Sequence, residues 1–154
     1  MEAAKVAASL AETADTLRGD PSSLYNLACM FALCDRRRVG PSDSRARARR
    51  LLATSLVRDE DPQEGRWALV AADVDLENVR DRIEELRIRI EAARRAQPAL
   101  ADMSGSAYRS RLNEILSGAG WNDAIHEAAD SPTGPTRRCQ CSPPRTIRLR
   151  GSYW

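Results

Sequence analysis

The stretch that decides the fold is DPSSLYNLACMFALC, which occupies residues 20–34. An Asp side chain can accept hydrogen bonds from free backbone amides, and a Pro costs nothing in the first turn, so Asp20-Pro21 indicates the start of a helix. The residues that follow are apolar on almost every side of that helix, which we expect to span about residues 21–36. A helix of this kind is buried on two sides. We therefore expect it to lie between two neighbouring helices.

Helical spacing continues on both sides of this stretch. Before it, apolar residues recur at intervals of three and four over residues 2–18, and Gly19 ends the pattern. This apolar set consists of Val6, Leu10, Ala14 and Leu17. After it, a helix is expected to open at residues 40–42 and to continue to about residue 58. Its inward set is Ala48, Leu51, Leu52, Ser55 and Leu56. Its arginines are expected to turn largely toward solvent, and these are Arg45, Arg47, Arg49 and Arg50.

The second half of the chain predicts a long charged helix followed by two weaker ones. A short helix near residues 64–72 leads through Asp73-Val74-Asp75-Leu76 into a helix that ends near residue 97, before Pro98. The apolar seam of the long helix alternates spacings of three and four, and consists of Leu76, Val79, Ile83, Leu86, Ile90 and Ala93. The weaker helices are expected near residues 107–116 and 121–129.

The apolar seam must be covered, and two arrangements are open. The helices that follow can fold back over it, or a second copy of the chain can pair with it as a coiled-coil dimer. Pro98 and the flexible run at residues 103–106 favour folding back, so we expect a monomer. The sequence thus predicts an all-α chain. It would have an antiparallel helix-pair array over residues 1–97 that the long charged helix caps, and a weaker helical extension over residues 98–130.

Composition and charge limit the classes of partner. The chain has 154 residues, of which 42% are hydrophobic, and no apolar run reaches the length of a membrane span. Residues 131–154 hold five arginines and no acidic residue, which leaves a net charge of −3 on residues 1–130. That charge gives no attraction for a nucleic-acid backbone. The Pro-rich basic tail at 131–154 is expected to be disordered, and the lack of a secretory signal predicts a cytoplasmic location.

No catalytic or metal-binding motif is recognisable. The single histidine, His126, has no Ser or Cys motif near it, and there is no glycine-rich phosphate loop and no kinase catalytic motif. Cys29 and Cys34 are expected to be small core residues, and Cys139 and Cys141 an accidental pair in the tail. The sequence therefore predicts a chain that is not an enzyme and has neither a metal nor a cofactor.

Residues 20–34 resemble the helix of the tetratricopeptide-like repeats found in the C-terminal regions of bacterial, especially planctomycete, serine/threonine protein kinases. The Arg- and Ala-rich run at residues 44–52 and the Asp-x-Asp-Leu segment at residues 73–80 are similar to the parts that follow in that family. The resemblance covers roughly residues 5–95 and does not include the catalytic domain.

This resemblance implies a non-catalytic module whose stacked helix pairs bind a protein or peptide partner. The polar-capable residues available for such a partner are Tyr25 and Asn26. Alternatively, both residues serve the fold, with the ring of Tyr25 packed against residues 2–18 and Asn26 bonded to an interhelix loop. For the whole chain, the alternative is a truncated or split serine/threonine kinase fragment whose catalytic domain is encoded elsewhere.

Overall fold

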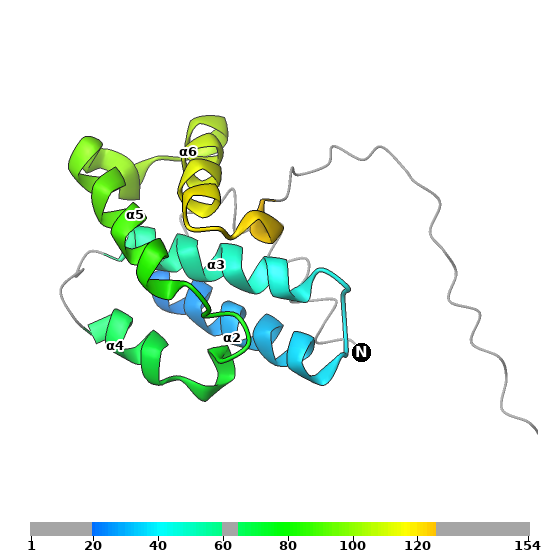
Figure 1. Ribbon diagram of the computed structural model, residues 1–154. Coiled ribbons are helices and arrows are strands. Elements are labelled where there is room, and N and C mark those ends of the chain that lie inside the picture. The colour runs from blue at the N-terminus through cyan, green and yellow to red at the C-terminus, as the bar shows by residue number, and fades with distance from the viewer. Residues whose placement is uncertain (1–19, 60–64, 126–154) are drawn as a thin grey trace, which may run out of the picture.

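The computed structural model describes residues 20–59 and 65–125, and within these ranges the chain is helical with no strand (Figure 1). The α-helices are α2 (Pro21–Arg37), α3 (Ser44–Arg58), α4 (Gly65–Ala72), α5 (Ile83–Ala96) and α6 (Gly105–Gly118). Short 3-10 helices lie between and after them, namely η1 (Val74–Leu76), η2 (Pro98–Asp102) and η3 (Asn122–Ala124). The predicted all-α class is confirmed. The expected helix at 2–18, the tail at 131–154 and His126 lie outside the described residues.

Helix α2 begins where the sequence predicts. The carboxylate of Asp20 accepts a hydrogen bond from the amide of Ser23 at 3.0 Å, and Pro21 occupies the first turn. The helix ends at Arg38, whose φ of 54° is left-handed and whose amide donates to the carbonyl of Asp35. From there the chain reverses into α3, which runs antiparallel to α2 (Figure 1).

Helix α3 forms the centre of the fold. It contacts α2, α5, α6, η2 and η3, and every one of its residues except Arg45 and Arg47 is buried. The predicted inward set is confirmed as buried. Helix α2 instead buries one face, against α3 and η1, while Met30 on another side is 40% exposed. Among the described elements, the helix that is enclosed nearly all round is therefore α3 rather than α2.

The expectation that the arginines of α3 face solvent is wrong for two of them. Arg49 is 5% exposed and Arg50 is 7% exposed, although Arg45 is exposed as expected. The reason is that α6, η3 and the segment before α5 lie over this side of α3 and supply acceptors for the guanidinium groups. Arg50, for example, donates to the side-chain oxygen of Asn113 at 3.0 Å.

The predicted long helix is broken in the structure. Its first part forms η1 and a turn, and α5 begins only at Ile83, after Arg82 adopts a left-handed φ of 58°. Asp73 accepts a hydrogen bond from the amide of Asp75 at 2.9 Å and thereby caps the short 3-10 helix. The turn also brings the amide group of Asn78 to the end of α2, so tertiary contacts outweigh the local helical preference.

The apolar seam is nevertheless buried within the chain. Helix α6 and η2 fold back against α5 (Figure 1). The buried seam residues are Leu76, Val79, Leu86, Ile90 and Ala93, while Ile83 is half-buried. The folded-back arrangement is confirmed by these contacts, and the monomeric state stays a prediction.

The two weaker helices have different outcomes. The first is α6, slightly longer than expected. The second, expected at residues 121–129, is reduced in the described part to η3, because the fully buried indole of Trp121 turns toward α3 and donates to the carbonyl of Asp81 at 2.8 Å. Gly120, with a left-handed φ of 75°, allows the turn that separates it from α6.

Arginine side chains also bind the free carbonyls at two helix ends. Arg94 of α5 donates to the carbonyls of Leu56, Val57 and Asp59 at 3.0, 2.6 and 2.6 Å. Arg80 binds the carbonyls at the end of α4 in the same way, including that of Asp73 at 3.2 Å. Both contacts satisfy acceptors that a helix terminus leaves without an internal donor.

Candidate functional site

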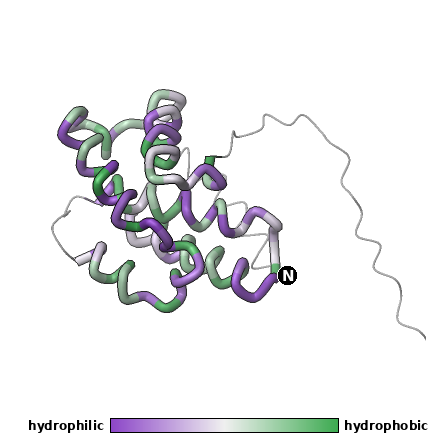
Figure 2. The backbone as a smooth tube through the Cα atoms, viewed as in Figure 1, coloured by the Kyte–Doolittle hydropathy of each residue, from purple (hydrophilic) through white to green (hydrophobic). Residues whose placement is uncertain are grey.

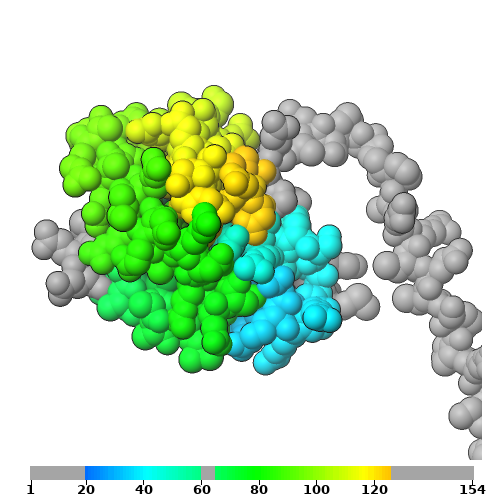
Figure 3. Space-filling view, in the orientation of Figure 1, coloured from blue at the N-terminus to red at the C-terminus, as the bar shows by residue number. Residues whose placement is uncertain are grey.

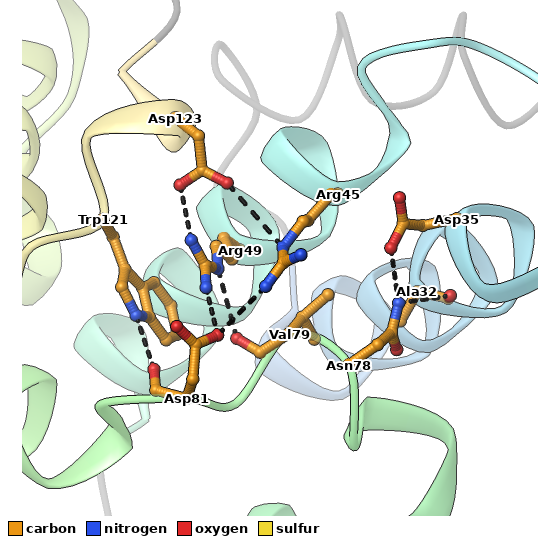
Figure 4. A network of polar contacts seen from close by, with 9 residues as sticks. All are labelled: Ala32, Asp35, Arg45, Arg49, Asn78, Val79, Asp81, Trp121 and Asp123. Atoms are coloured by element: carbon orange, nitrogen blue, oxygen red, sulfur yellow. Dashed lines mark hydrogen bonds and ion pairs between the residues drawn. The ribbon is translucent and has the colours of Figure 1, made fainter.

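A group of four charged side chains, Arg45, Arg49, Asp81 and Asp123, joins three parts of the described chain (Figure 4). Arg49 of α3 lies at its centre, where Nη1 donates to Asp123 at 2.6 Å, Nη2 to Asp81, and Nε to the carbonyl of Val79 at 3.3 Å. Arg45, one turn earlier, lies 3.4 Å from Asp81 and 4.0 Å from Asp123. Two guanidinium groups therefore face two carboxylates, and the cluster is neutral.

Burial and hydrogen bonding have opposite effects on the pKa of Asp81 in this cluster. Burial of Asp81 opposes its ionisation, but the hydrogen bond from Arg49 and the charges of Arg49 and Arg45 outweigh this, so the pKa of Asp81 lies below its ordinary value. The Arg49 guanidinium also lies 5.1 Å from the centre of the Trp121 ring. Every polar group here is engaged by another group of the fold. The cluster thus acts as a clamp between α3, η3 and the segment before α5.

A second polar group lies between α2 and η1. Asp73 accepts hydrogen bonds from the hydroxyl of Tyr25 at 2.6 Å and from the thiol of Cys29 at 3.7 Å. Burial and the adjacent carboxylate of Asp73 raise the pKa of Tyr25, and the same causes raise the pKa of Cys29 to about 12. A thiol with such a pKa is protonated at neutral pH and is therefore a poor nucleophile and metal ligand.

The carboxyl of Asp73 remains ionised in this group. Burial opposes its ionisation, but the hydrogen bonds from Tyr25 and the amide of Asp75 outweigh that effect and lower its pKa. The same side chain caps η1, so Asp73 serves as the first residue of that short helix. Cys29 and Cys34 are half-buried, so they lie at the edge of the core and not within it as expected.

The two residues that the sequence suggests for partner binding point to different sides of α2. Tyr25 is 5% exposed and its hydroxyl is bound to Asp73, whereas Asn26 is exposed. The structure therefore does not bring them together on one surface. Sequence reasoning missed Arg49, Asp81 and Asp123, and the only local signal was the spacing of Arg45 and Arg49 by one helical turn.

An apolar surface on α4 and η1 is the other candidate. Only Val70 of α4 is buried, and Figure 2 shows this helix as largely hydrophobic. Leu69 is 49% exposed and Val74 is 64% exposed. We call this surface the α4 patch, and it consists of Ala68, Leu69, Ala71, Ala72 and Val74, all of which are exposed.

The described part of the chain offers neither a metal centre nor a membrane-spanning helix. Within residues 20–59 and 65–125, no group of three or more His, Cys, Asp or Glu side chains could hold a metal ion. No helix in the same part of the chain is long and apolar enough to cross a membrane. Comparisons with protein-family models, with curated proteins and with solved structures find no match to this chain.

Proposed function

We propose that this chain is a non-catalytic helical module that binds another protein through the α4 patch. The observation that carries the proposal is the exposure of Leu69 and Val74 on a helix that buries only one of its own residues. Contiguous exposed apolar surface of this kind is characteristic of interaction sites. The resemblance of residues 20–34 to the helical region of bacterial serine/threonine kinases supports the same class of function.

The charges beside the α4 patch indicate the chemistry of the partner. Arg66 is paired with Asp59 at 2.6 Å and lies over the ring of Tyr25, and Asp73 is bound to Tyr25. Three further charges lie beside the patch: Arg36 donates to the carbonyl of Val74 at 3.1 Å and pairs with Asp75 at 3.8 Å, and Arg80 donates to the carbonyl of Ala71. All these flanking charges are engaged by other groups of the fold, and the residues of the patch carry none. We therefore expect the partner to bind the α4 patch with the apolar face of a helix, which carries aliphatic side chains at intervals of three and four residues.

Site-specific photo-crosslinking tests this proposal. A photoreactive amino acid placed at Leu69 is expected to capture a partner protein in cells, whereas the same group at Ile88, an even more exposed apolar position on α5, is not. The purified partner should bind the chain directly, and the Leu69→Asp/Val74→Asp variant should weaken that affinity at least about tenfold while leaving the circular dichroism spectrum unchanged. Equal capture from both positions, or an affinity that the double variant does not change, would refute it.

A further inference from the structure

Two exposed arginines, Arg82 and Arg89, lie against the end of α6. Arg82 directly precedes α5, and Arg89 follows it by seven residues, which is about two helical turns, so both side chains leave α5 on the same side. Within the part of the chain that the structure describes, neither guanidinium group forms a hydrogen bond or an ion pair. Their donors are therefore available to a ligand from solution.

Glycines give both guanidinium groups room to approach the backbone. A Cβ atom at Gly118 would lie 2.9 Å from Nε of Arg89, and a Cβ atom at Gly120 would collide with Nη1 of Arg82. Gly120 also needs its left-handed φ, but Gly118 is the last residue of α6 and does not have a positive φ. What glycine provides at position 118 is therefore the space that Arg89 occupies.

The two positive charges lie close together and are not neutralised by a neighbouring side chain. Gly118 and Gly120 are two residues apart, so their Cα atoms are separated by at most about 7 Å. Asp81, next to Arg82, is already bound by Arg49 and Arg45. Glu85 lies three residues after Arg82 and four before Arg89, yet it pairs with neither within the described chain. The partial negative charge at the carboxyl end of α6 favours cations at this place but leaves their donors unused.

We propose that Arg82 and Arg89 bind a phosphate group at the end of α6. A guanidinium group can donate two parallel hydrogen bonds to phosphate oxygens, and two adjacent guanidinium groups match the two negative charges of a phosphate dianion. The same chemistry applies to free phosphate and to a phosphorylated side chain of a partner. This site does not depend on the α4 patch, which lies on other elements.

Titration of the full-length chain with inorganic phosphate tests the proposal. The NMR signal of the Gly120 amide should shift and reach saturation, whereas sodium chloride at the same ionic strength should not reproduce the shift. Arg89→Gln should weaken phosphate binding at least about tenfold, because it removes charge-assisted hydrogen bonds. The matched control is Arg95→Gln, which removes an exposed charge from the same helix and should leave the affinity unchanged.

The Gly118→Ala variant distinguishes a built site from a general attraction to positive charge. It keeps every charge, and its helical position accepts Ala, but the added methyl group displaces the side chain of Arg89. Phosphate binding should weaken at least about tenfold while the circular dichroism spectrum stays unchanged. The control is Gly65→Ala, at the start of α4, where an added Cβ atom meets no neighbour. It should bind phosphate like the wild type.

A saturable shift that Arg89→Gln and Gly118→Ala weaken, and that both controls keep, supports the proposal. A shift that chloride reproduces, or one that survives either of the two site substitutions, would overturn it. A parallel titration with a short phosphoserine peptide identifies the source of the phosphate group. Tighter binding of the peptide than of inorganic phosphate would support a phosphorylated protein as the ligand, and equal binding would support the free anion.

Discussion

Arg49 shows how a charged side chain becomes part of a core. Its guanidinium has acceptors on three sides, from Asp81, Asp123 and the carbonyl of Val79, and an aromatic ring on its face. Arg45 shares the same carboxylates but is 47% exposed. Hydrogen bonds to a charged group are worth more where water does not compete for the donor. Arg49 is therefore expected to contribute more to the free energy of unfolding than Arg45, although both bind the same carboxylates.

Replacing each arginine by Met measures the two contributions to stability separately. Arg49→Met should lower the free energy of unfolding by about 2 kcal/mol, because it removes charge-assisted hydrogen bonds from a buried position while keeping most of the side-chain volume. Arg45→Met should lower it by less than about 0.5 kcal/mol, as expected for an exposed ion pair. Urea unfolding at neutral pH measures both, provided that the slope of the transition is unchanged. Equal effects of the two substitutions would contradict the claim that Arg49 contributes more to stability than Arg45.

Acidification distinguishes lost charge pairing from lost packing in the Arg49→Met variant. The pKa of Asp81 is lowered from 3.8 in the folded chain, so its stabilising effect is fully present above about pH 3.8 and is lost as the pH falls through the folded-state pKa. The stability gap between wild type and variant should therefore be largest near neutral pH and shrink in more acidic solution. A gap that stays constant would indicate that the substitution removed packing alone.

At the scale of elements, the sequence predicted those features that have a local cause. The start of α2 follows from Asp20-Pro21, and α6 follows from its apolar spacing. The break before α5 could not be predicted in this way, because it depends on Asn78 binding Ala32 and Asp35, more than 40 residues earlier. The enclosure of α3 likewise depends on elements that follow it in the chain. Local patterns indicate that a helix forms, but not how many neighbours cover it.

Helix α5 offers a matched pair of residues for testing which of its faces is covered. Ile90 is 1% exposed and Ile88 is 60% exposed. Ile90→Ala should lower the free energy of unfolding by about 2–5 kcal/mol, because it leaves a cavity between α5 and its neighbours. Ile88→Ala should change it by less than about 0.5 kcal/mol. Chemical denaturation of both variants provides the measurement, and a larger effect at Ile88 would mean that the helix packs with the opposite face.

At the scale of the whole molecule, contacts between distant residues hold the fold together. Arg49 and Asp123 are 74 residues apart, and Arg50 and Asn113 are 63 residues apart (Figure 4 shows the first pair). In the space-filling view of Figure 3, residues from both halves of the described chain meet in one continuous surface. Pairings over such separations leave no local pattern in the sequence. The fold class could therefore be predicted from the sequence, but the clamp could not.

The burial of the apolar seam within the chain bears directly on its oligomeric state. Leu86 is fully buried, and α6 and η2 already pack on α5, so all of the seam except part of Ile83 is covered within the chain. Light scattering should therefore give the mass of a monomer for the wild type. Leu86→Asp should unfold the chain, because a buried carboxylate without a partner is strongly unfavourable, whereas Ile88→Asp, on the exposed side of α5, should leave it folded. A dimer that Leu86→Asp converts into a folded monomer would instead show that the seam pairs two chains.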